Sequence, residues 1–122
     1  MNHYVIDYET LINMFGAVFQ HYKTGVTRQF VVHRLRNNFP ELVDFLIDNR
    51  DNQEWHISYN GLNFDAQITE FILRNADDLI NEDALTIASH IYDFAQSVIE
   101  RTSNDEFPPF APHELSIPQI DI

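Results

Sequence analysis

The chain has 122 residues, a formal net charge of −12 and no cysteine. Its length and its hydrophobic content of 44% predict a single domain, residues 1–122, with one core, and the lack of cysteine excludes disulfides and thiolate metal sites. The sequence has no apolar run long enough to span a membrane, and no basic segment precedes an apolar one at its start, so we expect a cytoplasmic protein without membrane contact.

The first third of the chain has the alternation that is typical of β-strands. In residues 4–9, YVIDYE, two tyrosines and an isoleucine fall on one face of the strand, and Val5, Asp7 and Glu9 fall on the other. Two carboxylates side by side on one strand face repel each other, so a purely structural strand is not expected to carry them. Two longer apolar strands follow, and they are predicted to form a hairpin around the turn at residues 23–25, KTG.

The hydrophobic period changes to that of a helix at Phe39. A helix of about three turns is predicted there, with Asn38 as its cap. Residues 55–59, WHISY, then predict a short strand, and helical spacing resumes from Ile68 to about Asn75.

The pair Asn60-Gly61 follows that short strand, and such a pair is common at the tip of a β-hairpin. The residues after Asn63 repeat at helical spacing, so we expect the pair to join a strand to a helix instead. Asn63 is then placed to cap this helix, and Asp65 falls in its first turn, where the helix dipole favours a negative charge.

A third helix is predicted from about Ala84 to Arg101, packed on the sheet. Its apolar stripe consists of Leu85, Ala88, Ile91, Tyr92, Ala95, Val98 and Ile99. The proline-rich residues 104–118 are predicted to form an extended connection, and the final QIDI to begin another strand.

This order of elements predicts an α/β fold with a mixed sheet: three N-terminal antiparallel strands, then a helix, a parallel strand and further helices. If the first and fourth strands are neighbours, Asp7 and Glu9 converge with Asp65. Three carboxylates in one place repel one another unless divalent cations neutralise them, and oxygen ligands favour Mg²⁺ or Mn²⁺. Phosphodiester hydrolysis by two metal ions is the chemistry that most requires such a cluster.

Two motifs resemble a known family. IDYET, residues 6–10, resembles the Asp-x-Glu-Thr motif of the DEDD-type 3′→5′ exonucleases, and YNGLNFD, residues 59–65, resembles their second motif as it occurs in family B DNA polymerases. The resemblance covers roughly residues 4–75. It implies a ribonuclease H-like fold, proofreading of the single-stranded 3′ end of DNA, and two Mg²⁺ or Mn²⁺ ions.

The resemblance also implies roles for individual residues. Asp7 would bridge both metal ions, Glu9 would ligate the hydrolytic ion, and Asp65 would hold the second ion directly or through water. The residues implied to position the 3′-terminal nucleotides are Thr10, Asn60 and Phe64. Judged by residue type alone, a turn conformation for Asn60 and a core position for Phe64 account for them equally well.

The family's third motif, in which a helix supplies a fourth carboxylate through Tyr-x-x-x-Asp or His-x-x-x-x-Asp, is absent from the sequence. We therefore expect the N-terminal part of a longer, phage-like polymerase or exonuclease, incomplete at the C-terminus, located in the host cytoplasm, with the polymerase module of the same chain as a partner and little activity alone. Two alternatives stay open: a non-enzymatic acidic interaction protein, and a degenerate exonuclease fold that binds a protein or single-stranded DNA.

The charge is uneven along the chain. Residues 1–36 hold two acidic and four basic residues, whereas residues 37–122 hold seventeen acidic and three basic ones. The net charge argues against general electrostatic binding of phosphates. For the basic first third, a contact with nucleic acid and solvated charges at a strand edge are both compatible with the sequence.

Overall fold

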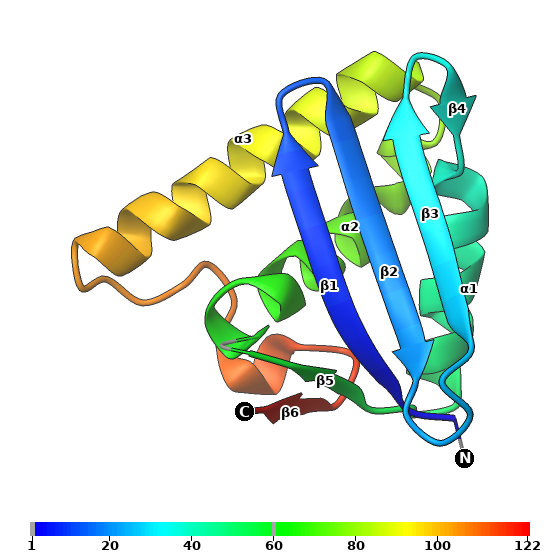
Figure 1. The fold of residues 1–122 in the computed structure, drawn as a ribbon. Coiled ribbons are helices and arrows are strands. Elements are labelled where there is room, and N and C mark those ends of the chain that lie inside the picture. Colours follow the sequence, from blue (N-terminus) through cyan, green and yellow to red (C-terminus); the bar gives the residue numbers. More distant parts are fainter. Residues whose placement is uncertain (1, 60) are drawn as a thin grey trace.

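The computed structural model of the chain describes residues 2–59 and 61–122. These residues form an α/β fold with a mixed six-stranded sheet and three α-helices (Figure 1). The strands are β1 (Tyr4–Leu11), β2 (Met14–His21), β3 (Thr27–His33), β4 (Arg36–Asn37), β5 (His56–Ser58) and β6 (Gln119–Asp121). The helices are α1 (Phe39–Asp51), α2 (Asp65–Leu79) and α3 (Ala84–Ser103), with short 3₁₀ helices η1 (Gly61–Asn63) and η2 (Pro112–Glu114).

The first half of the sheet is an antiparallel meander of β1, β2 and β3, as predicted. Across it, Asp7 lies opposite Val18, and Val18 lies opposite Gln29. The turn between β2 and β3 contains Gly25 at a φ of +74°, a conformation that glycine adopts without strain. The strand β4, which pairs with the end of β3, was not predicted, because two residues are too few to show a period.

The other half of the sheet is parallel. β5 lies beside β1, with His56 opposite Tyr4 and Ile57 opposite Val5, and β6 lies beside β5. The strand order is therefore β4-β3-β2-β1-β5-β6. The predicted α/β class is confirmed, with three antiparallel strands followed by parallel ones. The first strand and the strand at residues 56–58 are neighbours, which was the condition for Asp7 and Asp65 to approach each other.

All three described helices lie on one face of the sheet (Figure 1). Side chains of this covered face, such as Ile6, Phe15, Phe19 and Val32, are buried in the core. The alternate side chains of β1–β3 point to the opposite side, which we call the open face, and no described helix lies over it. The open face consists of Val5, Asp7, Glu9, Leu11, Met14, Gly16, Val18, Gln20, Thr27, Gln29, Val31 and His33.

Helix α1 begins at Phe39 with Asn38 as its N-cap residue, as predicted, but the Asn38 side chain forms no capping hydrogen bond. The Asn38 amide oxygen instead accepts a hydrogen bond from the Val31 N–H at 3.1 Å. The neighbouring Asn37 amide oxygen accepts one from the Phe39 N–H, also at 3.1 Å. The Asn38 side chain thus bonds to the sheet and not to the helix, because its amide oxygen is the acceptor that both the strand N–H and the helix N-terminus need.

The join between β5 and α2 is helical rather than a hairpin, as predicted, but Asn63 is not the cap. Asn63 belongs to η1, and the N-cap is Phe64, whose side chain cannot accept a hydrogen bond. The chain enters α2 through a 3₁₀ turn, which moves the helix boundary one residue later. Asp65 is the first residue of α2, in the turn where it was predicted. Asn60 lies outside the described residues.

Helix α3 crosses the sheet on its covered face, as predicted (Figure 1). Its buried side chains are Ala84, Ile87, Ala88, Ile91, Ala95 and Val98. The predicted stripe was too wide, since Leu85 and Ile99 are exposed by 48% and 44%. The last turns of α3 extend past β1, so part of the helix has no sheet to pack on (Figure 1).

Two buried polar residues of α2 hold the proline-rich segment that precedes β6. Glu70 accepts hydrogen bonds from the N–H and the hydroxyl of Ser116 at 2.7 and 3.0 Å. Gln67 forms a pair of 2.9 Å hydrogen bonds with the backbone of Phe110. A segment with no strand partner needs such side-chain contacts to satisfy its backbone. Within the described residues, no helix combines the length and the apolar character that crossing a membrane requires.

Candidate functional site

Strand β1 loses its parallel neighbour where β5 ends. The pairing stops at Val5 and Ile57, and after Ser58 the chain turns through η1 into α2. A hollow of about 380 Å³ lies beside β1 at this point, and we call it the acidic hollow. It is lined by Val5, Ile6, Asp7, Tyr59 and Asp65. Two of the three carboxylates singled out in the sequence therefore face one hollow, although they are far apart in the chain.

Contacts of the first turns of α2 fix the position of Asp65. The Tyr8 hydroxyl on the covered face of β1 forms a buried hydrogen bond with the Thr69 hydroxyl, one helical turn after Asp65. The Gln67 amide donates a hydrogen bond to the Leu62 carbonyl in η1 at 2.9 Å. These bonds tie α2 to β1 and to the turn before it. Asp65 is consequently held against the sheet, with an exposed fraction of only 9%.

Burial and the nearby charge of Asp7 raise the pKa of the Asp65 carboxyl from 3.8 to about 7. Burial is the larger cause, because the charged form loses its hydration. The N-terminus of α2 acts in the opposite direction, since its dipole favours a carboxylate, but burial and Asp7 together prevail. Asp7 itself is exposed. At neutral pH, ionising both groups costs free energy that a bound cation would relieve.

Glu9 lies on the open face, two positions along β1 from Asp7, but it does not line the acidic hollow. It lines an adjacent hollow of about 160 Å³, which we call the central hollow. The central hollow is lined by Asp7, Glu9, Met14, Gly16, Ala17, Val18, Gln29 and Val31. The structure thus brings Asp7 and Asp65 together and leaves Glu9 on the other side of Asp7.

The side chains of the acidic hollow fit a hard divalent cation. Mg²⁺ prefers oxygen ligands, keeps several waters and is commonly bound through one or two carboxylates. Asp7 and Asp65 supply two such groups, and a hollow of about 380 Å³ leaves room for water. In the described part of the chain, no group of three or more histidine, aspartate or glutamate side chains is close enough to hold one ion jointly.

The residues implied to position nucleotides are dispersed. Thr10 lies on the covered face of β1, half-buried and opposite Phe15. Phe64 packs against the core and, together with Asn63 and Ile99, also lines a separate hollow of about 320 Å³. Neither Thr10 nor Phe64 lines the acidic hollow. The role expected for Asn60 falls outside the described residues.

Tyr59 is a residue of the site that sequence reasoning did not assign. Its side chain is 78% exposed and lines the acidic hollow, and its only signal in the sequence was its position at the start of YNGLNFD. His56, three residues earlier, belongs to the core instead. Its Nε2 donates to the Asn49 amide oxygen at 2.7 Å, and burial lowers its pKa to about 3, so the ring stays neutral.

We compared the chain with protein-family models, with curated proteins and with solved structures, and none of the three comparisons gave a match.

Proposed function

We propose that this domain is a metal-dependent nuclease of the DEDD 3′→5′ exonuclease type. The observation that carries the proposal is the hollow shared by Asp7 and Asp65, which come from two motifs of that family and meet only through folding. The sheet supports the finer assignment to a ribonuclease H-like fold, because three antiparallel strands precede the parallel ones and β1 lies between the two halves. The finer proposal, that this is the proofreading domain of a DNA polymerase, is supported by the resemblance of residues 59–65 to the second motif of family B DNA polymerases.

Each residue of the site has a distinct part in this proposal. Bound Mg²⁺ or Mn²⁺ ions would supply a hydroxide nucleophile near neutral pH and stabilise the leaving oxygen of the phosphodiester. Asp7 would hold these ions from β1 and Asp65 from the start of α2. Glu9 would join them from the side of the central hollow. Tyr59, an exposed ring at the rim, would stack on an unpaired base.

The proposal is tested with a single-stranded oligonucleotide that carries a label at its 5′ end. Incubation with the chain and Mn²⁺ is expected to shorten it slowly and stepwise from the 3′ end, since the chain lacks the family's third motif, and EDTA, Asp7→Asn or Asp65→Asn should abolish the reaction. Asp44→Asn is the matched control, because Asp44 is an exposed carboxylate on α1 that does not line the acidic hollow.

A second readout makes the test independent of turnover. Calorimetric titration with Mn²⁺ should show binding to the wild type and to Asp44→Asn, and loss of that binding in Asp7→Asn. A wild type that neither binds Mn²⁺ nor shortens the oligonucleotide would contradict the proposal.

One observation favours a second candidate, a nuclease-like fold that holds single-stranded nucleic acid without cleaving it. Only two of the three expected carboxylates line the acidic hollow, and the described residues contain no group of three that could hold a metal ion. A protein of this kind would bind the labelled oligonucleotide and leave it intact in Mn²⁺. The two candidates therefore give opposite results in the cleavage assay.

A further inference from the structure

The open face of the sheet has a gap at its centre. The register of β1, β2 and β3 places Glu9, Gly16 and Val31 in one row across the three strands. Gly16 has no side chain, and a Cβ built at this position would meet no atom within 4 Å. The central hollow is this gap, bounded on one side by the row of Asp7, Val18 and Gln29.

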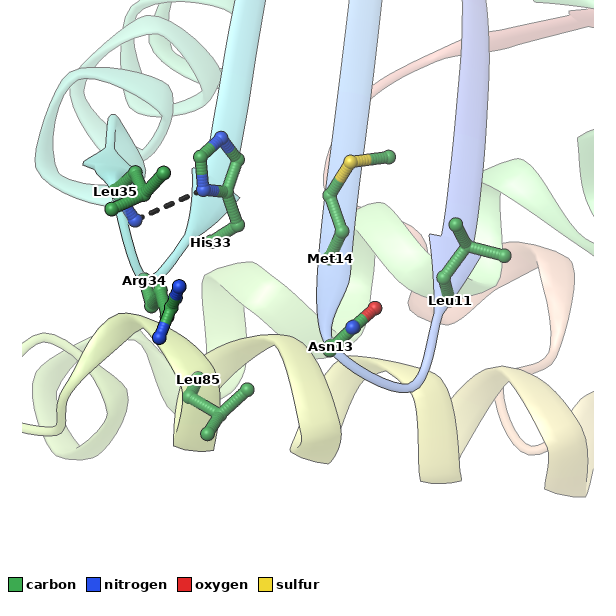
Figure 2. A pocket seen from close by; sticks show the side chains of 7 residues that line it. All are labelled: Leu11, Asn13, Met14, His33, Arg34, Leu35 and Leu85. Atoms are coloured by element: carbon green, nitrogen blue, oxygen red, sulfur yellow. Dashed lines mark hydrogen bonds between the residues drawn. The ribbon is translucent and has the colours of Figure 1, made fainter.

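Three hollows adjoin along this face. The acidic and central hollows share Asp7, and the central hollow shares Met14 with a third hollow of about 270 Å³ at the ends of the strands. We call this third one the tip hollow. It is lined by residues of the β1–β2 and β3–β4 turns and by Leu85 of α3 (Figure 2).

Since neighbouring hollows share Asp7 at one junction and Met14 at the other, the three follow one another diagonally across the strands, and we call this series of hollows the depression. Its length is roughly 15–20 Å, given about 4.8 Å between strands and 3.4 Å per residue along them. It runs from the start of α2 to the β3–β4 turn.

The far end of the depression carries unpaired positive charge. Arg34 lines the tip hollow, and Arg36 lies opposite His33, so it shares the open face with that residue. His33 Nδ1 accepts a hydrogen bond from the Leu35 N–H at 3.0 Å, which orders the turn that presents Arg34 (dashed line in Figure 2). Among the described residues, neither Arg34 nor Arg36 has an ion pair or a hydrogen bond from its guanidinium.

The other arginines all have partners for their charge. The Arg28 guanidinium lies 4.9 Å from the centre of the Phe45 ring on the covered face. The remaining three contact Asp51, Glu70 and the Phe107 carbonyl; they are Arg50, Arg74 and Arg101. The two guanidinium groups that remain available for a ligand are therefore that of Arg34, which lines the tip hollow, and that of Arg36, which lies opposite His33.

We propose that this depression binds single-stranded nucleic acid, with a phosphate held by Arg34 and Arg36 at the tip hollow and the strand running over Gly16 to the acidic hollow. The inference builds on the proposed function and adds the path of the substrate. Charge complementarity selects the occupant, because guanidinium groups bind phosphate directly at one end, and carboxylates bind it through divalent cations at the other.

The middle of the depression suits the remaining parts of a nucleotide. Val18 and Val31 offer apolar contact to sugars and bases, and the Gln29 amide can hydrogen-bond either of them.

Two kinds of variant test the path. Gly16→Tyr fills the central hollow, and Arg34→Ala with Arg36→Ala removes the charge at the tip. Gln20→Tyr is the control for Gly16→Tyr, because it adds a tyrosine to the same strand and face but outside the three hollows. Arg50→Ala is the control for the loss of an arginine. Thermal unfolding establishes that each variant folds, and the arginine pair keeps the test decisive should Gly16→Tyr not fold.

The measurement is the fluorescence anisotropy of a 5′-labelled single strand about ten nucleotides long, with Ca²⁺ in place of Mg²⁺ and again in EDTA. We expect Gly16→Tyr and the arginine pair each to weaken binding at least about tenfold, and the pair to reduce the slope of log affinity against log salt by roughly two. Both controls should bind as the wild type does.

The outcomes separate this inference from the proposed function. If Asp7→Asn and EDTA weaken binding but the Gly16 and arginine variants do not, the metal site stands and the path is wrong. If the Gly16 and arginine variants weaken binding but Asp7→Asn and EDTA do not, the path stands and the metal site falls. If the wild type does not bind the single strand, the proposed path is wrong. The same holds if the depression binds an extended peptide and no nucleic acid.

Discussion

The two faces of the central sheet are built on opposite principles. On the covered face, large apolar side chains fill the space between sheet and helices, and the Phe19 ring alone contacts the rings of Tyr4, Tyr8, Phe30 and Phe45. On the open face, two carboxylates follow each other on β1, a glycine interrupts the row beside them, and unpaired arginines lie at the end.

This difference separates the residues that stabilise the fold from the residues that are available for binding and catalysis. Like charges on one strand face and a glycine inside a strand both lower stability. Residues that break the rules for a stable sheet are expected at functional sites, where selection acts on activity. Here they lie along one surface, and the covered face accounts for the core without them.

Replacing neighbouring residues of β2 that point to opposite faces tests this contrast most directly. Phe19→Ala removes a fully buried ring and should lower the free energy of unfolding by about 3–5 kcal/mol. Val18→Ala, on the open face, should cost less than about 1 kcal/mol, because no closed cavity forms. Urea denaturation measures both, and equal losses would mean that the open face is packed as tightly as the covered one.

Asp65→Asn should stabilise the metal-free protein at alkaline pH. In the folded state the Asp65 carboxyl keeps its proton until its raised pKa of about 7, whereas in the unfolded chain it loses it near 3.8. The folded state therefore binds more protons between these values, and the free energy of unfolding falls as the pH rises through this window. The loss at pH 8 is of the order of 2–4 kcal/mol, and the uncharged amide of the variant should not suffer it.

Thermal unfolding at pH 4 and pH 8 in EDTA measures this effect. The wild type and Asp65→Asn should be similar at pH 4 and should diverge at pH 8, with the variant more stable. Asp44→Asn on α1 is the control and should track the wild type at both values. An Asp65→Asn variant that is less stable than the wild type at pH 8 would mean that the Asp65 carboxylate is stabilised in the fold without a metal ion.

Tyr8→Phe tests the link between the two faces. Tyr8 packs on the covered face, and its hydroxyl binds Thr69 one turn after Asp65. Losing this buried hydrogen bond should cost about 1–2 kcal/mol in urea denaturation and weaken Mn²⁺ binding in calorimetry, because Asp65 is no longer held in place. Tyr4→Phe is the matched control, since within the described chain the Tyr4 hydroxyl makes no hydrogen bond. Unchanged Mn²⁺ affinity in Tyr8→Phe would mean that other contacts position α2.

Local patterns were sufficient to predict the three long strands, the short strand before α2 and the three helices, but not β4. Periodicity placed Asp7 on a strand face and Asp65 in a first helical turn. That β1 and β5 are neighbours was a condition the sequence left open, and the structure supplies it. The partner of the Asn38 side chain escaped prediction, because its amide oxygen accepts a hydrogen bond from β3, which no local pattern reveals. The tip hollow also escaped, since it is assembled from two turns and α3, and only tertiary packing joins them.

Gly16→Val has the smallest expected effect on stability, and it tests directly whether the fold requires the gap on the open face. A Cβ at this position would meet no atom within 4 Å, and a β-branched residue suits a strand better than glycine does, so the free energy of unfolding should rise by about 0.5–1 kcal/mol. Urea denaturation measures the change, with Ala17→Val as the contrasting control, because Ala17 is fully buried on the covered face and a larger side chain there should destabilise by about 1–3 kcal/mol. If Gly16→Val is destabilising, the fold itself requires the gap. If it is stabilising, the gap persists for what the open face binds.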